Sequence, residues 1–301
     1  MSSEIATGGI PPTTAIVATP ELPRRAGRLK ALRRYPALSM GGGIILVLIV
    51  LALAAPLLSP SDPNAINSDD VLVGIGAHHP FGTDNLGRDL LSRVLYAYRT
   101  SLLIAITATA ASLVVGVPLG LLAGYAGGWT DNVIMRVMDV FFAFPTILLA
   151  IALISVFGSG MGVLMLAIGT IYVPYIARVV RGSSLGIKQE LFIEGARARG
   201  AGPIRIMFRH ILPNCLGAIL VQVSLMLAFA ILIEAALSFL GLGIEPPTPS
   251  LGRMLSDGRD FMSDNPPVVI FPGAAIGLAV LSFNLIGDGL RDWADTRRRG
   301  R

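Results

Sequence analysis

The chain has 301 residues, of which 53% are hydrophobic and only 14% are charged, with a formal net charge of +5 at pH 7. This composition is too apolar and too poor in charge for an ordinary soluble domain, so it indicates a membrane protein. The positive charge does not indicate a nucleic-acid partner, because the basic residues lie in short clusters beside apolar segments rather than along one soluble face.

The first 39 residues are predicted to be a cytoplasmic tail. Residues 1–23 are rich in Ser, Thr, Ala, Gly and Pro without periodicity, so no stable structure is expected there. A basic block follows, made of Arg24, Arg25, Arg28, Lys30, Arg33 and Arg34. Basic clusters beside a membrane span stay on the cytoplasmic side, which places this tail inside the cell.

Residues 40–58 form an uninterrupted apolar run, about as long as the roughly 20 residues needed to cross a bilayer. The run is long for the apolar part of a signal peptide and further spans follow, so it is predicted to be an uncleaved first transmembrane helix. Residues 59–99 are polar and are predicted to form an extracytoplasmic loop that ends in an amphipathic helix. This loop contains His78, His79, Asp84, Arg88 and Asp89.

Five further spans are predicted within the core at 100–290. They are expected at 101–123, 133–156, 163–180, 216–239 and 268–290. Six spans place both termini on one side, and all but five of the 24 Lys and Arg residues then lie on that side, including those of the tail at 291–301. The exceptions are Arg88, Arg93, Arg99, Arg253 and Arg259. This asymmetry predicts that both termini are cytoplasmic.

A polar insertion at 181–213 separates two of these spans and has the pattern of a segment that contacts another protein. Leu185, Phe192 and Ala196 follow a helical spacing, which predicts one shared apolar face. Gly200 and Gly202 then break the helix, and Pro203 stands where a second helix would begin. The expected structure is a helix, a sharp bend and a short helix.

Four stretches of the sequence carry a family resemblance over residues 30–296. Glu194-Gly-Ala196, Gly200 and Leu212-Pro213 resemble the EAA loop of ABC importer permeases, with Gly195 in place of an alanine and His210 in place of an isoleucine. The stretches at 79–89, 234–247 and 284–292 look like the C-type permease subunits of dipeptide, oligopeptide and nickel importers. Four such stretches in this order make coincidence improbable.

The resemblance implies an all-α polytopic protein with six transmembrane helices, the type I ABC importer permease fold and a cytoplasmic EAA coupling loop. The loop would dock in a groove of an ATPase subunit and transmit the closure of that subunit to the spans. The residues to which this role is carried over are Glu194, Gly195, Ala196, Arg197, Arg199, Gly200, Gly202, Pro203, Leu212 and Pro213.

The resemblance also implies the partners of the chain in a bacterial plasma membrane. They are a second homologous permease subunit, two ATP-binding subunits, an extracytoplasmic peptide-binding protein and membrane lipid. Neither of the two lysines, Lys30 and Lys188, follows a glycine as a phosphate-binding P-loop requires. We therefore expect a non-catalytic subunit without a cofactor of its own, with ATP and Mg²⁺ bound by the ATPase partners.

Docking of the binding protein is predicted at the loops 59–99 and 241–267, with Asp84, Arg88 and Asp89 as candidate contacts. The pair His78-His79 suggests a nickel or zinc site, but adjacent histidines in an extended loop point to opposite sides and no nearby carboxylate or cysteine completes a ligand set. A role in the loop structure is favoured, and no metal site is predicted. The single cysteine, Cys215, excludes an internal disulfide.

Ionisable residues within spans are candidates for function, and Asp139, Glu234 and Asp288 are the relevant ones. All three are predicted near span ends, where snorkelling or helix capping explains them. The translocation path is predicted to be lined by the second, third and fifth spans, with Gln222, Ser224 and Glu234 as its candidate residues. Glycines and prolines such as Gly116 and Pro118 either line this path or allow close helix packing.

The favoured function is a permease subunit for di- or oligopeptides, and a permease for nickel or another small solute is the alternative. A rival of a different class is an ion-coupled secondary transporter, but the sequence places no carboxylate at mid-membrane depth. An intramembrane enzyme is a second rival. It is disfavoured because no pair of His, Cys or acidic residues has the spacing of a nucleophile with its base or of a metal site.

Overall fold

The computed structural model describes residues 35–299, with side chains described as far as residue 294. The predicted basic block at 24–34 and the end of the predicted tail 291–301 lie outside the described residues. Within 35–299 the chain is helical, and its one element of β pairing is an isolated bridge between Thr83 and Asp89.

Five helices are long and apolar enough to cross a membrane, or six if a bent pair counts as one span. The five are α2 (Pro36–Leu53), α4 (Leu90–Ala126), α7 (Met161–Ile187), α10 (Leu212–Phe239) and α12 (Pro267–Arg299). The bent pair consists of α5 (Gly128–Phe142) and α6 (Thr146–Phe157). The predicted six-span, all-α architecture is confirmed at this level.

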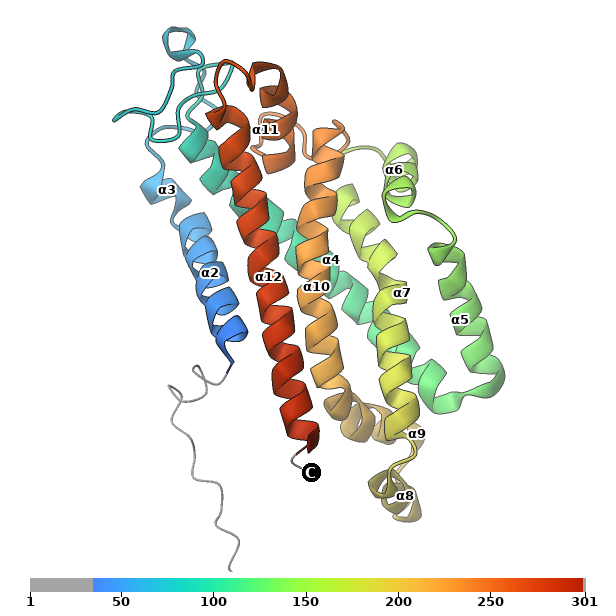
Figure 1. Ribbon diagram of the computed structural model, residues 1–301. Coiled ribbons are helices and arrows are strands. Elements are labelled where there is room, and N and C mark those ends of the chain that lie inside the picture. Colours follow the sequence, from blue (N-terminus) through green and yellow to red (C-terminus); the bar gives the residue numbers. More distant parts are fainter. Residues whose placement is uncertain (1–34, 300–301) are drawn as a thin grey trace, which may run out of the picture.

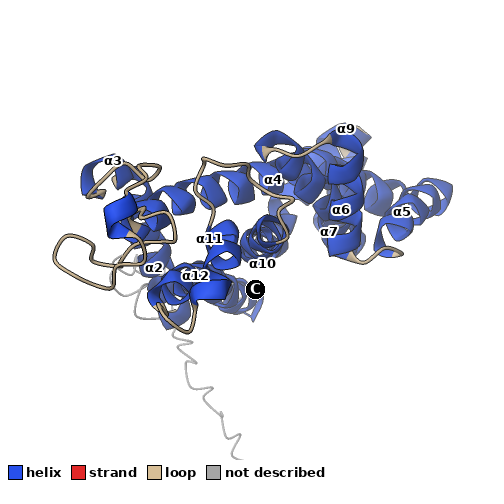
Figure 2. Cartoon of the chain, turned by 90° about the horizontal axis from the view of Figure 1, so that it is seen from above, coloured by secondary structure: helices blue, strands red, loops and turns tan. Residues whose placement is uncertain are grey.

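The spans lie side by side, with α4 packed on α7, α10 on α12 and α12 on α2 (Figure 1). α4 runs obliquely across the other spans, and the view along the bundle shows the helices in an elongated arrangement (Figure 2). One end carries the short helices α8 (Leu191–Ala198) and α9 (Pro203–Arg205), and we call it the α8 end. The opposite end, the α11 end, carries α3 (Ala55–Leu58), α11 (Leu251–Gly258) and the loop at 59–89.

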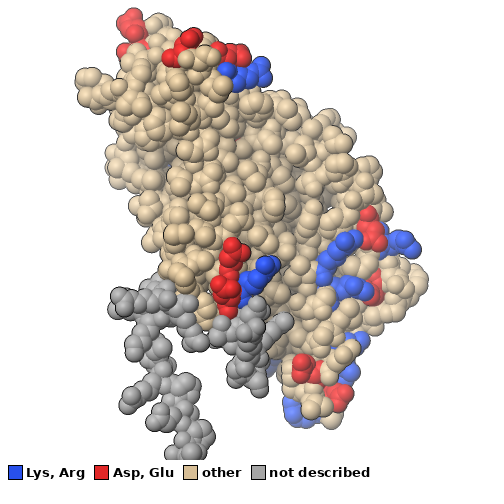
Figure 3. All heavy atoms as spheres, viewed as in Figure 1, with Lys and Arg blue, Asp and Glu red and all other residues tan. Residues whose placement is uncertain are grey.

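Charged side chains gather at the two ends of the molecule. On the face shown in Figure 3, acidic and basic residues gather at the α11 end and, in the other half of the molecule, near α8, over α5 and α7 and near the end of α12, and a band between these groups carries none. A band of this kind suits the hydrocarbon core of a bilayer, where a charged side chain costs several kcal/mol. The long helices therefore cross the membrane between the α8 end and the α11 end.

The third predicted span, 133–156, is not one helix. α5 and α6 meet at an angle of 88°, with the break at 143–145. Pro145 explains the break, because its ring disfavours helical conformation at Phe144 and its nitrogen cannot donate to the preceding turn.

The first two spans also differ from their predicted bounds. α2 begins at Pro36, a residue suited to the first helical position, and the helix is interrupted at Ala54 before α3. α4 begins at Leu90, inside the segment expected to be a loop, so the predicted amphipathic helix and the second span are one element of 37 residues. The carboxylate of Asp89 caps its first turn by accepting a hydrogen bond of 2.7 Å from the backbone N–H of Ser92.

A row of glycines on α4 lets it pack closely on α7. A Cβ atom on Gly116 would lie 2.9 Å from the carbonyl oxygen of Val173, and one on Gly120 would lie 2.5 Å from that of Ala177. One on Gly124 would lie 2.7 Å from the Cβ of Ser184. Glycines four residues apart share one helical face, so the spacing allows the two backbones to approach. Of the two uses open to Gly116 from the sequence, the structure therefore shows close helix packing.

Candidate functional site

The insertion between α7 and α10 forms two short helices at the α8 end. α7 ends at Ile187 and α8 begins at Leu191, with Glu190 in an extended conformation between them. The predicted continuous face of Leu185, Phe192 and Ala196 is therefore wrong, because the helix breaks between the first two. Ala196 is buried, whereas the side chain of Phe192 is 45% exposed.

Gly200 creates the predicted bend after α8. Its φ angle of +79° lies in the left-handed region, where glycine meets no Cβ penalty. The N–H of Gly200 donates to the carbonyl of Arg197 at 2.8 Å, and that of Ala201 donates to the carbonyl of Ala196 at 3.1 Å. These two bonds form a Schellman motif, which ends the helix and redirects the chain.

The second short helix of the insertion is continuous with a transmembrane span. Pro203 occupies the first position of α9, as predicted. α9 continues through η2 (Ile206–Ile211), a turn of π-helix, into α10, whose first two residues are Leu212 and Pro213. The bend at Gly200 is thus joined to α10 without an intervening loop, so a displacement of α9 is passed to α10 along one helical path.

The surface of α8, α9 and η2 exposes large apolar side chains. Leu191 is 82% exposed and Ile204 is 71% exposed, and Phe192 and Phe208 are about half exposed. The opposite sides of these helices are anchored in the bundle by Ile193, Ala196, Ile206, Met207 and Ile211. We call the set Leu191, Phe192, Glu194, Ile204 and Phe208 the α8–α9 surface. Apolar side chains exposed outside the membrane band are typical of a protein-binding surface.

One further feature of this surface favours a partner. Glu194 is exposed, and no side chain among residues 35–294 pairs with it. A methyl group on Gly195 would lie 3.7 Å from the guanidinium of Arg199, which is an ordinary contact. The departure from alanine at Gly195 therefore alters no packing within the chain.

The structure joins α8 to the end of α4 through residues that the sequence did not single out for this role. The amine of Lys188 donates a hydrogen bond of 2.6 Å to the backbone carbonyl of Tyr125, in the last turn of α4. The guanidinium of Arg197, on α8, lies 5.5 Å from the centre of the Tyr125 ring. A cation at a helix C-terminus interacts favourably with its free carbonyl groups. The α8–α9 surface is therefore attached to α4 as well as to α7 and α10.

We expect the substitution Lys188→Met to loosen α8 from α4. It removes a charge-assisted hydrogen bond, which contributes about 1.5–3 kcal/mol, so local opening should become about tenfold or more frequent. Limited trypsin digestion at Arg197 and Arg199 in membranes should be faster in proportion. Lys188→Arg, which keeps the charge and the donor, should digest like the wild type, and equal rates for all three proteins would contradict the attachment.

Two ion pairs hold α5 against α7 near the α8 end. The guanidinium of Arg181 contacts both carboxylate oxygens of Asp131, at 2.5 and 2.6 Å. Arg178 binds Asp139 at 2.5 Å and lies 3.9 Å from the centre of the Phe142 ring. Asp139, for which snorkelling or capping was expected, thus has a basic partner on α7 and a half-exposed side chain. Sequence alone did not reveal these pairs, because the residues of each are 39 or 50 positions apart.

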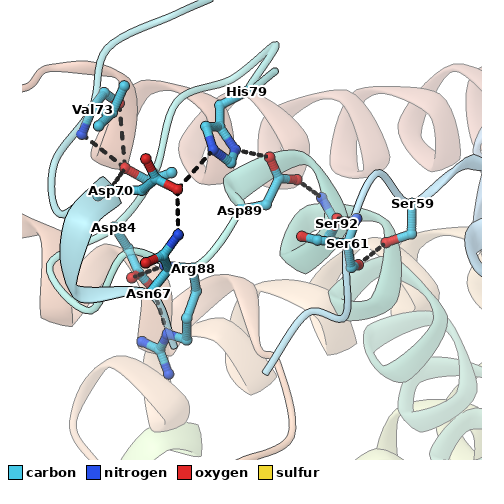
Figure 4. A network of polar contacts seen from close by, with 11 residues as sticks. Ser59, Ser61, Asn67, Asp70, Val73, His79, Asp84, Arg88, Asp89 and Ser92 are labelled. Atoms are coloured by element: carbon cyan, nitrogen blue, oxygen red, sulfur yellow. Dashed lines mark hydrogen bonds and ion pairs between the residues drawn. The ribbon is translucent and has the colours of Figure 1, made fainter. Parts of the chain in front are cut away.

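At the α11 end, the candidate docking residues belong to the framework of the loop (Figure 4). Asp84 accepts hydrogen bonds from the backbone N–H groups of Leu86 and Arg88 and from the Arg88 side chain. Asp89 caps α4 and contacts the ring of His79 at 2.9 Å. Both carboxylates are buried, so Asp84 and Asp89 shape the loop, and contact of Asp84, Arg88 and Asp89 with a docked protein stays a prediction.

His79, one of the two adjacent histidines, has two acidic partners that the sequence did not indicate. His79 lies between the carboxylates of Asp89, at 2.9 Å, and Asp70, at 3.6 Å (Figure 4). Nearby carboxylates therefore do exist, although no group of three or more His, Cys, Asp or Glu residues in the described part of the chain is placed to hold a metal ion. His79 fastens the loop at 59–89 to the start of α4.

The three residues predicted to line the path lie on α10 but face different surroundings. Gln222 is half-buried, and its place on the translocation path stays a prediction. Ser224 is buried, and a Cβ on Gly287 of α12 would lie 2.7 Å from its hydroxyl. Glu234 is fully buried and hydrogen-bonded, so snorkelling does not explain it. Neither Ser224 nor Glu234 lines an open path in this conformation, because both are enclosed by neighbouring helices.

The bundle of apolar spans, its broken third span and the exposed α8–α9 surface define a polytopic membrane protein with an exposed apolar surface at one end. Residues 116–300 match the family of binding-protein-dependent transport system inner membrane components. Residues 27–74 match the N-terminal TM domain of oligopeptide transport permease C. The chain belongs to this family of inner-membrane components and is a permease subunit of an importer.

Similar proteins support the same assignment. The chain is 44% identical over 270 residues to the dipeptide transport system permease protein DppC of Alkalihalophilus pseudofirmus, which covers 90% of this chain and 89% of that one. It is 46% identical over 267 residues to the glutathione transport system permease protein GsiD of Pectobacterium atrosepticum, covering 88% of both. The MetNI methionine ABC transporter in an inward-facing conformation shares the fold, with a TM-score of 0.55 at 20% identity over 67% of this chain and 95% of that chain.

Proposed function

We propose that this chain is one of two unlike permease subunits of an ABC importer for short peptides, with two ATPase subunits and an extracytoplasmic binding protein as its partners. The substrate class is supported by the relatives, one of which is named for dipeptides and another for glutathione, itself a short peptide. Nickel or another small solute is the alternative substrate.

The observation that carries the coupling role is the α8–α9 surface. Its apolar side chains are exposed outside the membrane band and stand on helices anchored by buried neighbours, as a docking site for a soluble protein requires. Its attachments reach α4, α7 and α10, so movement of a docked ATPase would displace several spans together.

The orientation follows from the same assignment and from the charge distribution. The α8 end would be cytoplasmic, and the α11 end, with the loop at 59–89 and α11, would face the binding protein. Basic residues at 178–209 lie at or near the α8 end, whereas only Arg253 and Arg259 follow on the other side before α12. Both termini would then be cytoplasmic.

The proposal is tested with proteoliposomes that contain the complete transporter with ATP enclosed. Uptake of a labelled dipeptide should require Mg-ATP and the binding protein, and a protonophore should leave it unchanged. Uptake driven by an imposed proton gradient without ATP would instead support the ion-coupled rival. Absence of uptake for labelled di- and tripeptides, together with ATP-dependent uptake of radiolabelled nickel, would replace the peptide assignment by the alternative substrate.

A further inference from the structure

A fully buried carboxylate joins three helices near the α11 end. Glu234 lies in the last two turns of α10, and its side chain has no solvent exposure. The hydroxyl of Ser101 on α4 donates to it at 2.7 Å, that of Ser238 on α10 at 2.9 Å and that of Ser250 at 3.0 Å. Among residues 35–294, no Lys, Arg or His forms an ion pair with Glu234. Three hydroxyl groups therefore satisfy this carboxylate.

The same serines also fix the chain between α10 and α11. Ser250 is the N-cap residue of α11, and its hydroxyl accepts a hydrogen bond of 3.5 Å from the backbone N–H of Arg253. The hydroxyl of Ser238 accepts one of 3.4 Å from the backbone N–H of Ile244. Glu234 thus determines the position of the hydroxyl that starts α11 and of the hydroxyl that holds the turn before it.

The backbone packing around Glu234 leaves α11 little room to move on its own. A Cβ on Gly252 of α11 would lie 2.0 Å from the carbonyl oxygen of Ala235, the residue after Glu234. A Cβ on Gly243 would lie 2.0 Å from the hydroxyl of Ser238. Distances this short require glycine, so α11 and its preceding turn press directly on the backbone of α10.

The face of α11 that does not pack on α10 faces outward. Arg253 and Asp257 form a half-exposed ion pair at 3.4 Å there. A small cavity between α11 and the loop at 59–89 is lined by Asp84, Arg88 and Asp257, so the two elements adjoin. α11 is therefore part of the outer surface. Its inner side packs on α10 and α12, and Glu234 is the one carboxylate among the described residues that hydrogen-bonds to Ser101 of α4 and to the N-cap of α11 together.

We propose that Glu234 is a positioning residue that fixes α11 to α4 and α10, so that a binding protein docked on α11 displaces these two spans with it. This inference rests on the proposed function, because it assigns the outer surface to the binding protein. It gives the buried carboxylate a role in signalling from the outer surface to the ATPase side. The path runs from α11 through Glu234 to α10, which continues into η2 and α9 at the coupling loop.

The test compares two substitutions of Glu234 in the reconstituted complete transporter. Glu234→Gln keeps an oxygen acceptor, and its amide can donate to a serine hydroxyl, which rotates freely. Glu234→Leu leaves three buried hydroxyl groups without their acceptor. Because each unsatisfied buried group costs free energy, α11 should loosen, and the stimulation of ATP hydrolysis by the binding protein should fall at least about fivefold in Glu234→Leu, the equivalent of about 1 kcal/mol. Basal hydrolysis should change by less than about twofold, and Glu234→Gln should restore the stimulation.

A second measurement reports the attachment itself. Spin labels at Arg253→Cys on α11 and Arg99→Cys on α4, in a Cys215→Ala background, should give a narrow distance distribution in the wild type and in Glu234→Gln. The distribution should broaden in Glu234→Leu. If Glu234→Leu does not assemble, Ser101→Ala removes the α4 hydroxyl that donates to Glu234, leaves the N-cap of α11 in place and should broaden the distribution as well. The matched control is Ser282→Ala, a fully buried serine whose hydroxyl bonds within its own helix.

Retention of both the stimulation and the narrow distribution in Glu234→Leu, or in Ser101→Ala where only that variant assembles, would overturn the inference. Failure of the proposed function gives a different result. The wild-type transporter would then show no stimulation by any binding protein, while the distance measurement would still report whether Glu234 holds α11.

Discussion

Replacing Gly120 by alanine is expected to lower the thermal stability of the detergent-solubilised subunit strongly and to reduce its yield in the membrane. The added methyl group would lie 2.5 Å from the carbonyl oxygen of Ala177 and 2.8 Å from the Cβ of Val180. Neither contact is with the end of a flexible side chain, so α4 and α7 must move apart. Overpacking of this kind costs typically about 1–3 kcal/mol, and here it would also weaken the neighbouring contacts of Gly116 and Gly124.

The matched control for this prediction is Gly182→Ala, on α7. Gly182 has no atom within 4 Å of the position of an added Cβ, and its side of the helix is exposed. Alanine is favoured over glycine within a helix by up to about 1 kcal/mol, so this variant should be as stable as the wild type or slightly more stable. The measurement is the temperature of half-maximal loss of the monodisperse peak in size-exclusion chromatography. Equal losses in the two variants would contradict close packing at Gly120.

Sequence reasoning predicted the features that depend on local composition. The apolar runs predicted where each span lies, although α4 begins at Leu90 rather than at 101 and the third span is broken. Gly200 and Pro203 predicted the bend and the second helix of the coupling loop, because φ preference and a missing N–H act at the residue itself. The break at Pro145 was open to the same reasoning. The run at 133–156 was nevertheless predicted as one span, although the effect of Pro145 on Phe144 indicates a helix end.

The features that depend on contacts between distant segments were not predicted. The hydrogen-bond partners of Glu234 come from α4, α10 and the N-cap of α11. In the sequence, Glu234 lies near a span end, and this position suggested snorkelling. The partners of His79, Asp70 and Asp89, lie nine and ten positions away on a loop without periodicity. For Gly116, the sequence left open whether it lines the path or allows close packing, and its contacts with α7 decide between the two. A single sequence specifies such pairs only through the fold.

Replacing Gly200 by valine is expected to uncouple transport from ATP hydrolysis. The native φ of +79° places any L-residue in the left-handed region at a cost of about 1–2 kcal/mol, and more for a β-branched side chain. The chain would then leave the Schellman conformation, and α8 would lose its fixed orientation relative to α9 and α10. We expect the amount of peptide imported per ATP hydrolysed to fall about tenfold or more, because α8 and α9 no longer move as one body with the docked subunit.

Two controls separate this effect from a general sensitivity of the loop. Gly200→Asn should keep coupling close to the wild-type value, since asparagine tolerates the left-handed conformation. Gly202→Ala should also be tolerated, because Gly202 has a φ of −70° and no atom within 4 Å of an added Cβ. Membrane insertion of all three variants should be normal, since the bend lies outside the spans. Wild-type coupling in Gly200→Val would show that the bend does not transmit force. Equal loss in Gly202→Ala would show that the partner requires small residues at both glycines, and the conformational explanation would then be wrong.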